Sequence, residues 1–542
     1  MRYYASYQFF AHPAQHHGGL KEAKVVAKFT EDFQVEWKNP EDNRLTWLYD
    51  PMHFPGPLLP LTGEFLDRMY SAYMSARTVY VNGFAFSTGM NPRPPSPEII
   101  QRGAFDVWTK DYMPQVQKVS EGLRSADYDS IDVAELGDSV EKFMAQAVEA
   151  FGLTMRVITG FMGPTFGLVQ FLQDELGADG ALAAATLLQG FENSTASAGA
   201  GLSELADAAI KSPAVVEALS RGDYDSVESV EGGPEFLRLF GDYLSKYGWR
   251  IESWGRLHLP TWAENQNTPL MLIGRYVSDP ARAPAAIARA VKQREEMTQE
   301  VESKLSGEKL QQFRGLLTGA QMHVSVSEGR ALWQLIILGS LRVPFLALGR
   351  KLVAAGAFER PEDVFLMTTD ELRDATHNPS STVRSTVVKR RADYERWENL
   401  APPPFVGAPP DPSQIPPEMQ PILHLFFGAG EPVMEGRKLK GQGASKGVVR
   451  GRARVIKDLS DSDRLQKGDI LVCATTAPPW TPLFAVVGGV VTDSGGILSH
   501  SAICAREYAI PCVVATQIAT SVIQDGAMIV VDGTEGTVEI ES

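Results

Sequence analysis

The stretch Gly495-Gly496-Ile497-Leu498-Ser499-His500-Ser501-Ala502-Ile503-Cys504-Ala505-Arg506-Glu507 lies between two apolar runs, residues 487–492 and 512–515. This pattern predicts a strand, a glycine turn, a helix and a second strand. His500 is then expected in the first turn of the helix, where unpaired backbone N–H groups and the positive end of the helix dipole favour an anion. A phosphoryl group carried on the imidazole would be such an anion.

The same stretch resembles the phosphohistidine signature of the phosphoenolpyruvate-utilising enzymes, which reads Gly-Gly, a few residues, Ser-His-x-Ala, Ala-Arg-Glu and Ile-Pro. The positions in register are Gly495, Gly496, Ser499, His500, Ala502, Ala505, Arg506, Glu507 and Pro511. In that family the histidine carries a phosphoryl group between two active sites on a swivelling domain. The resemblance therefore implies that His500 is phosphorylated, whereas a helix-starting histidine without this context is more often a cap or a surface residue.

Length and composition narrow the class of protein. A chain of 542 residues is too long for one core, and its net charge of −15 argues against nucleic acid or an anionic membrane as partner. The three cysteines lack metal-ligand spacing, which indicates a reducing compartment. The N-terminus lacks the apolar core of a signal peptide, and charges interrupt the apolar residues 331–357. We expect a soluble cytoplasmic protein with a buried or amphipathic helix at 331–357.

Helical spacing of apolar residues dominates the first 400 residues. Phe65, Met69 and Tyr73 share one face of a predicted helix, and a cap-like Asp138 with Glu141 predicts the start of another. We predict a multidomain protein: a mainly α-helical acceptor-binding domain at 1–400, a proline-rich hinge at 401–427 and a C-terminal α/β domain at 428–542. The hinge follows from proline pairs and triplets between 402 and 417, which favour an extended connector. The resemblance identifies the α/β domain as the swivelling phosphohistidine domain.

Two turn-rich segments, 247–254 and 258–264, concentrate Arg, Glu, His and Trp between predicted helices. Such a composition suits either a polar site with aromatic walls or a salt-bridged loop that ties helices together. The segments resemble the acceptor-binding region of rifampicin phosphotransferases, with Trp249 in place of the usual histidine. Weaker similarities cover residues 47–61, 328–330 and 360–368.

The predicted site residues follow from the chemistry of phosphoryl transfer. His500 is the nucleophile, and the Ser499 hydroxyl and Arg506 are catalytic candidates near the phosphoryl oxygens. Arg506 could instead fix the helix. Transfer to a phenol requires a base, for which the candidates are His53, His258, Glu252, Glu264 and Glu328. Further acceptor-binding candidates are Arg250, Trp254, Trp262 and Arg330, and candidates for phosphate contact are Thr475, Thr476, Gly495 and Gly496. The two threonines could instead cap the next helix.

Leu498 stands where the dikinase branches have threonine, so the chain is closer to the rifampicin phosphotransferase branch. No P-loop or ATP-grasp-like stretch is found. A helical acceptor-binding domain joined to a carrier domain without a nucleotide-binding domain resembles the histidine-bearing subunit of the two-component phenylphosphate and 4-cresol phosphate synthases. This resemblance implies an ATP-grasp partner subunit that holds ATP and Mg²⁺, with no cofactor or metal bound by this chain. The implied reaction converts ATP, a phenolic or other small hydroxyl acceptor and water to AMP, phosphorylated acceptor and phosphate. A phosphoenolpyruvate-dependent phosphotransferase and a regulatory protein phosphocarrier remain the alternatives.

Overall fold

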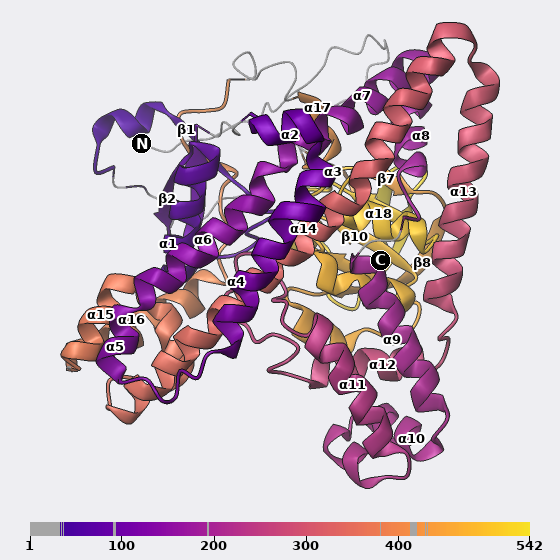
Figure 1. Cartoon of the computed structure of the whole chain (residues 1–542). Coiled ribbons are helices and arrows are strands. Elements are labelled where there is room, and N and C mark those ends of the chain that lie inside the picture. The colour runs from indigo at the N-terminus through magenta and orange to yellow at the C-terminus, as the bar shows by residue number, and fades with distance from the viewer. Residues whose placement is uncertain are drawn as a thin grey trace.

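The computed structural model of the chain describes residues 33, 35, 37–89, 94–191, 194–379, 381–411, 420–428, 430 and 432–541. A helical region is followed by a C-terminal region built on a nine-stranded sheet (Figure 1). This arrangement agrees with the predicted order of a mostly helical part and an α/β part.

The helical region contains η1 (Pro40–Arg44), β1 (Thr46–Tyr49), α1 (Pro60–Met69), the π-helix η2 (Tyr70–Met74), β2 (Arg77–Val81), β3 (Phe84–Thr88), α2 (Pro97–Arg102), α3 (Ala104–Val107), the π-helix η3 (Trp108–Tyr112), α4 (Met113–Ser125), α5 (Val133–Asp138), α6 (Val140–Arg156), α7 (Ile158–Leu176), η4 (Gly177–Asp179), α8 (Gly180–Leu187), α9 (Ser194–Ile210), α10 (Pro213–Arg221), η5 (Tyr224–Ser229), α11 (Gly233–Tyr247), α12 (Asn267–Tyr276), α13 (Arg282–Lys304), α14 (Gly307–Ala354), η6 (Pro361–Leu366), α15 (Thr369–His377) and α16 (Ser381–Trp397).

The 48-residue helix α14 is the axis of this region, about 70 Å long at 1.5 Å per residue. It packs against α4, α6, α7 and η6 (Figure 1). Among the described helices, α14 alone has the length and hydropathy to cross a membrane, and 78% of that apolar window is buried inside the protein. Core packing therefore accounts for its apolar composition, as predicted for residues 331–357.

Apolar residues spaced along one helix face form the core around α14. Phe143, Ala147 and Phe151 of α6 are buried there, as their spacing predicts. The predicted cap at Asp138 is wrong: Asp138 ends α5, and the N-cap of α6 is Ser139, because a short extra helix precedes α6.

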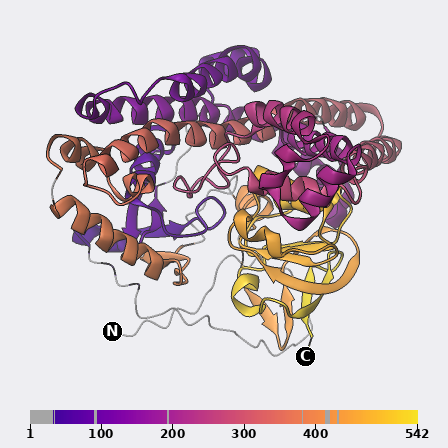
Figure 2. The same ribbon diagram turned by 90° about the horizontal axis from the view of Figure 1, so that it is seen from below.

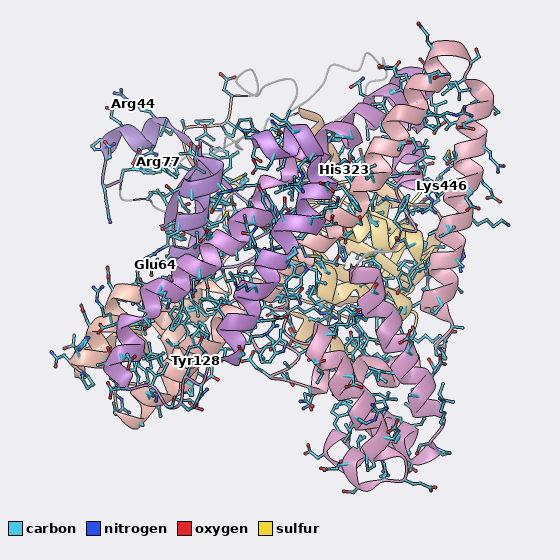
Figure 3. All side chains as sticks on the ribbon, viewed as in Figure 1. Arg44, Glu64, Arg77, Tyr128, His323 and Lys446 are labelled. Carbon is cyan, nitrogen blue, oxygen red and sulfur yellow. The ribbon has the colours of Figure 1, made fainter. Side chains whose placement is uncertain are left out.

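Long-range hydrogen bonds tie the early helices to the end of the helical region. The carboxylate of Glu64 on α1 (Figure 3) accepts a hydrogen bond from the backbone N–H of Thr369 at 2.8 Å. Thr369 begins α15, whose N-terminus has a capping box between Thr368 and Glu371. The segment 360–368 is thus anchored to the first helix.

A four-stranded sheet of order β2-β3-β1-β4 borders the helical region. Its edge strand β4 (Phe405–Gly407) comes from the predicted hinge and pairs antiparallel with β1, with Val406 opposite Trp47. Residues 412–419, the middle of that hinge, lie outside the described residues. The start of the hinge is therefore fixed to the helical region, and the domain boundaries themselves stay a prediction.

The C-terminal region contains α17 (Gln420–Leu425), β5 (Val433–Glu435), β6 (Lys438–Lys440), β7 (Gln442–Ser445), β8 (Val448–Val455), η9 (Leu459–Arg464), β9 (Ile470–Cys473), η10 (Pro478–Ala485), β10 (Gly489–Thr492), α18 (His500–Glu507), β11 (Cys512–Val514), α19 (Ala519–Val522), β12 (Met528–Asp532) and β13 (Thr537–Ile540).

The nine strands have the order β5-β6-β13-β12-β8-β9-β10-β11-β7, with parallel pairing from β8 to β11. Alternate residues of β9 enter different cores: Ile470 and Val472 join a core within the sheet region, whereas Leu471 and Cys473 join a core shared with the helical region. The sheet is therefore buried on both faces, as parallel strands usually are.

The C-terminal region is docked on the helical region, where α18 contacts α13 and η10 contacts α9 and α12 (Figure 2). Phe240 and Tyr243 of α11 share one hydrophobic core with Trp480, Phe484 and Tyr508 of the C-terminal region. This contact places the helix that begins with His500 against the helical region.

Candidate functional site

His500 is the first residue of α18, as the sequence predicts. The N-cap is Ser499, whose Oγ accepts a hydrogen bond from the backbone N–H of Ala502 at 3.4 Å. The Ser499 side chain therefore satisfies one N–H of the first turn, and His500 lies at the positive end of the helix dipole, which favours an anion.

The glycine turn before His500 is bound to the end of the hinge. The backbone N–H groups of Gly495 and Gly496 donate to the carbonyl oxygens of Phe427 at 3.0 Å and Phe426 at 2.8 Å. A Cβ on Gly496 would lie 2.2 Å from the carbonyl oxygen of Leu425, so only glycine fits there. In this arrangement both N–H groups donate to carbonyl oxygens of the hinge, so they are not available to a phosphoryl group. The predicted phosphate contact of both glycines stays a prediction and would require a different position of the C-terminal domain.

The imidazole of His500 contacts residues of both regions. Its Nδ1 lies 3.6 Å from Oε2 of Glu328 on α14, and the two side chains are only 12% and 14% exposed. Its Nε2 lies 3.2 Å from Oγ1 of Thr481 and 3.5 Å from Sγ of Cys504. Because the Thr481 hydroxyl donates its proton to the carbonyl oxygen of Pro478 at 3.0 Å, its oxygen is an acceptor for an N–H of His500.

These contacts fit a protonated imidazole. Burial lowers the pKa of His500, but its contacts with Cys504 and with the Glu328 carboxylate raise it more, so the pKa lies well above its ordinary value. Burial also raises the pKa of the Cys504 thiol, so this thiol is neutral near pH 7 and Glu328 supplies the charge that acts on His500. The docked state therefore holds an imidazolium with both N–H groups facing acceptors.

Arg506 and Glu507 fix α18 in place. The guanidinium of Arg506 donates to the carbonyl oxygens of Ala444 at 3.0 Å and Ile497 at 2.8 Å, and burial lowers its pKa to about 10. Oε1 of Glu507 accepts a hydrogen bond from the backbone N–H of Gly190 in the helical region at 3.3 Å, and burial raises its pKa to about 7. These contacts support the structural interpretation of Arg506.

The two predicted threonines differ in position. Oγ1 of Thr476 lies 2.8 Å from Oγ of Ser501, the residue after His500, so Thr476 is next to the site. Thr475 lies in the turn between β9 and η10. The N-cap of η10 is Ala477, so neither threonine has the alternative role of a cap.

The two arginines predicted to neutralise a phosphoryl group are both shielded from water. The guanidinium of Arg250 lies 4.0 Å above the ring of Trp262, and Nη2 donates to the hydroxyl of Tyr243 at 3.5 Å. Burial lowers the pKa of Arg250. Burial also lowers the pKa of Arg330 to about 10, although the charge of Glu328 opposes this change. Both guanidinium groups stay cationic near neutral pH.

Glu252 joins the two regions rather than lining an open site. Its Oε2 accepts a hydrogen bond from the backbone N–H of Leu459 in the C-terminal region at 3.1 Å. Burial and the neighbouring Asp458 raise its pKa to about 8. Nearby, the guanidinium of Arg256 lies 3.4 Å from Asp458. Glu252 and Glu507 are thus two buried carboxylates that accept N–H groups across the docked surface, in opposite directions.

His258 and Glu264 belong to a polar network around the buried side chains of Arg256 and Arg342. Glu264 accepts two hydrogen bonds from Arg342 on α14, at 3.0 and 2.9 Å. The hydroxyl of Tyr394 forms a hydrogen bond with Nε2 of His258, with 3.3 Å between the two atoms. Burial, together with the charges of Arg256 and Arg342, lowers the pKa of His258 to about 3. This is the salt-bridged loop that the sequence left as the alternative to a site, and His258 is a poor proton acceptor in it.

His53 has different surroundings. Its Nδ1–H donates to Oδ2 of Asp50 at 2.6 Å, and Oδ1 of Asp50 accepts the backbone N–H groups of Met52 and His53, each at 3.1 Å. The imidazole is 33% exposed. Its ring centroid lies 5.2 Å from that of Trp254 and 5.9 Å from that of Phe427. His53 is therefore next to the hinge segment that binds the glycine turn of His500.

The sequence interpretation named His500, Glu328, His53 and Trp254 but missed several residues that hold them. Asp50, Thr481 and Cys504 were not predicted. Cys504 could have been found, because it lies four residues after His500 on the same helix face. Thr481 and Asp50 give no such local signal.

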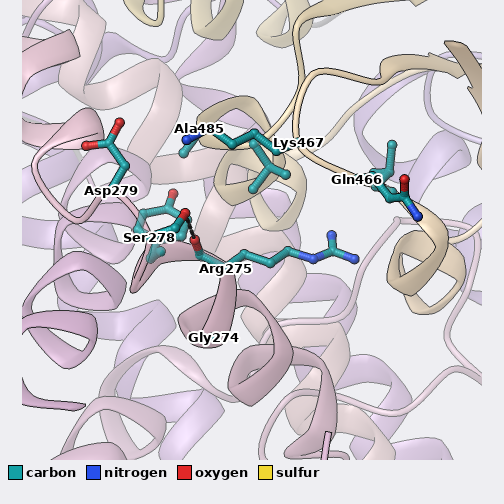
Figure 4. A pocket seen from close by; sticks show the side chains of 10 residues that line it. Gly274, Arg275, Ser278, Asp279, Gln466, Lys467 and Ala485 are labelled. Atoms are coloured by element: carbon teal, nitrogen blue, oxygen red, sulfur yellow. Dashed lines mark hydrogen bonds between the residues drawn. The ribbon is translucent and has the colours of Figure 1, made fainter. Parts of the chain in front are cut away.

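A cavity of about 300 Å³ lies where the two regions meet, away from the residues named above (Figure 4). Its walls are residues 274–276 at the end of α12, residues 278 and 279 just after it, and residues 465–467, 485 and 486. Across the described residues, no group of three or more His, Cys, Asp or Glu side chains could hold a metal ion.

Comparison with known proteins finds one matching domain family in each of the two regions. The model of the PEP-utilising enzyme mobile domain matches residues 465–536, which include Thr481, His500 and Cys504. The model of the rifampicin phosphotransferase fourth domain matches residues 153–328, which end at Glu328. The phosphohistidine signature and the acceptor-region resemblance are thereby confirmed at the level of these domains.

Relatives among characterised and uncharacterised proteins are similar over much of the chain. Chondramide synthase cmdD of Chondromyces crocatus is 27% identical over 94% of this chain and 14% of its own length. A rifampicin phosphotransferase of Streptomyces sviceus is 31% identical over 72% of this chain and 44% of its own length. The uncharacterised phosphotransferase YvkC of Bacillus subtilis is 29% identical over 59% of this chain and 38% of its own length. The chain spans less than half the length of each of these relatives.

Proposed function

We propose that this chain, with a mobile domain like that of the PEP-utilising enzymes and a region like the fourth domain of rifampicin phosphotransferase, is a phosphotransferase component. His500 accepts a phosphoryl group and transfers it to the hydroxyl of a small, phenolic acceptor at the helical region. One observation carries the proposal: the imidazole of His500 lies at a helix N-terminus and faces Glu328 of the helical region at 3.6 Å. Matches to both domains and similarity to a rifampicin phosphotransferase support it.

The contacts of the imidazole assign roles to its two nitrogens. Nδ1 keeps its proton toward Glu328, and loss of the proton that faces Thr481 makes Nε2 the nucleophile. Backbone N–H groups at the start of α18 and the Ser499 hydroxyl would stabilise charge on the phosphoryl oxygens. A neutral imidazole is then the leaving group in the second transfer.

The donor in this proposal is ATP, bound with Mg²⁺ by a nucleotide-binding partner of the ATP-grasp type that releases AMP and phosphate. The low exposure of His500 supports two separate sites, because a side chain that is 12% exposed in the docked state must leave it to meet a nucleotide. Proline pairs and triplets between residues 402 and 417 favour an extended connector, which suits such a movement. The acceptor side supplies aromatic rings and a histidine, which suit a phenol.

Acid-labile phosphate and intact mass test the proposal. The chain is incubated with ATP alone, with phosphoenolpyruvate alone and with ATP plus host-cell extract, next to a His500→Ala variant. Label that requires ATP plus extract and is absent from the variant is the expected result. Label from phosphoenolpyruvate alone would show that phosphoenolpyruvate, and not ATP, is the phosphoryl donor. A complete lack of label would contradict the proposed function.

A further inference from the structure

We propose that the Asp50–His53 pair is the general base that deprotonates an aromatic hydroxyl acceptor, which lies against the rings of Trp254 and Phe427. The inference rests on the proposed function and names the base and the acceptor class for its second half-reaction. We call Asp50, His53, Trp254 and Phe427 the His53 cluster.

The hydrogen bond at the base sets the proton positions. Since Nδ1–H of His53 donates to Asp50 at 2.6 Å, the lone pair of the neutral ring is on Nε2. Asp50 is itself held by two backbone N–H groups and is 12% exposed, so the carboxylate is fixed behind the ring. A carboxylate in this position orients the imidazole and stabilises the imidazolium that forms when Nε2 takes a proton.

The other predicted bases are poorly suited to accept a proton from the acceptor, because each has other partners in the structure. His258 is half-buried beside the charges of Arg256 and Arg342, Glu264 is paired with Arg342, and Glu252 accepts an N–H across the docked surface. Glu328 faces His500 itself. Of the predicted bases, His53 combines partial exposure with a carboxylate partner and aromatic neighbours.

Aromatic side chains around His53 indicate the class of acceptor. Trp254 and Phe427 are both partly exposed and approach the imidazole nearly perpendicular, with interplanar angles of 68° and 61°. The indole N–H of Trp254 donates to Oε1 of Gln334 on α14 at 3.0 Å, so this ring is fixed. Fixed aromatic faces beside a base favour a planar aromatic compound that carries a hydroxyl.

The hinge connects this cluster with the phosphorylated residue. Phe427 touches His53 with its ring, and its carbonyl oxygen accepts the N–H of Gly495 in the turn that leads to His500. The same residue is therefore in contact with the base and with the phosphohistidine turn. In the docked arrangement Phe427 thus links the base to the turn that leads to His500.

The transfer step balances in atoms and charge. The acceptor oxygen forms a bond to phosphorus while the bond between phosphorus and Nε2 of His500 breaks, and the electron pair of that bond stays on Nε2. The acceptor proton moves to Nε2 of His53, whose positive charge is balanced by Asp50. His500 leaves as a neutral imidazole because Nδ1 keeps its proton toward Glu328, and the product is an aryl phosphate.

Two phenols of different acidity test the base. The full-length chain is phosphorylated with ATP plus host-cell extract, freed of nucleotide and mixed with phenol or with 4-nitrophenol, which is largely ionised at mildly alkaline pH. Loss of phosphohistidine and formation of aryl phosphate are followed in time. For His53→Gln we expect transfer to phenol to fall by about 100-fold, the scale of general-base catalysis, and transfer to 4-nitrophenol to fall far less.

Asp50→Asn and a surface histidine complete the test. Asp50 is a positioning residue, so Asp50→Asn should slow transfer to phenol less than His53→Gln does and should again affect 4-nitrophenol far less, because the base is still present but the carboxylate that orients it is gone. His377→Gln is the matched control, since His377 forms a similar pair with Asp138 at 2.9 Å but is 50% exposed at the end of α15. It should leave both reactions unchanged.

The outcomes separate this inference from the proposed function. Equal losses for the two phenols in His53→Gln, or no loss, would overturn the base while phosphohistidine formation still upheld His500 as the carrier. Transfer to neither phenol by the unmodified chain would overturn the aromatic acceptor and the inference with it. If phosphohistidine does not form under any condition, the proposed function fails first.

Discussion

Oε2 of Glu328 lies 3.6 Å from Nδ1 of His500, which links the longest helix of the helical region to the first residue of α18. The pair crosses the docked surface, and both side chains are shielded from water. A charge pair in this setting affects docking and the protonation of the imidazole together.

Glu328→Gln removes that charge while it keeps the size of the side chain. We expect phosphohistidine still to form, and transfer to the acceptor to slow by about 100-fold, because the proton that makes imidazole a good leaving group is held less well. Rapid-quench measurement of phosphohistidine decay with acceptor reports the step. Glu308→Gln, an exposed change on the same helix, is the control. Equal decay in both variants would show that Glu328 has no part in transfer.

Docking should also weaken as pH rises. Burial raises the pKa of Glu507 to about 7 and that of Glu252 to about 8, so both bind protons in the docked state that they would lose when exposed. The docked state is therefore favoured most at pH values below the ordinary range of glutamate and loses stability as pH rises toward 7 to 8. The raised pKa of His500 acts in the same direction, because its pair with Glu328 is lost as pH rises through that pKa.

Hydrogen exchange tests this pH dependence at two amides. The N–H of Gly190 donates to Glu507 and the N–H of Leu459 donates to Glu252. In a variant with Glu252→Gln and Glu507→Gln, the ionisable groups are gone, so both amides should stay protected to higher pH than in the unmodified chain. Protection that falls with pH equally in the two proteins would contradict the role of these carboxylates.

The sequence predicts the carrier better than the acceptor site, for physical reasons. His500, its helix and its glycine turn belong to one contiguous segment, so local sequence patterns are enough to predict them. Glu328 was named, yet its contact with His500 depends on docking of two regions far apart in the chain. Asp50 and His53 are only three residues apart, but the sequence does not predict that this pair lies beside Phe427 of the hinge, because that contact is long-range. The edge strand β4 likewise depends on long-range pairing with β1 and was missed inside the predicted hinge.

The glycine turn gives a prediction for the hinge. In Gly496→Ala the new Cβ would lie 2.2 Å from the carbonyl oxygen of Leu425, so the hinge must move and its hydrogen bonds to the turn break. Overpacking of this kind costs about 1–3 kcal/mol. Thermal unfolding and cleavage of the hinge by a protease should both show the change. Gly430→Ala, where the nearest atom is 4.0 Å away, should resemble the unmodified chain.

Thr481 gives the most direct test of how the imidazole is held. Its hydroxyl donates to Pro478 and thus offers an oxygen to Nε2–H of His500 at 3.2 Å. Thr481→Val keeps the shape but removes this acceptor, so Nε2–H of the imidazolium in the docked state loses its oxygen partner. We therefore expect His500 to release its proton at lower pH than in the unmodified chain.

Nitrogen-15 spectra of a histidine-labelled chain follow that proton, and His500→Ala identifies the signal. Thr186→Val on α8, whose hydroxyl bonds only within its own helix to Leu182 in the described part of the chain, is the matched control and should leave the titration of His500 unchanged. If the two threonine variants titrate alike, Thr481 does not hold the proton on Nε2. A shift confined to Thr481→Val means that Nε2 gives up a proton held by Thr481 before it can attack phosphorus, and phosphorylation of that variant should then reach its maximum at lower pH.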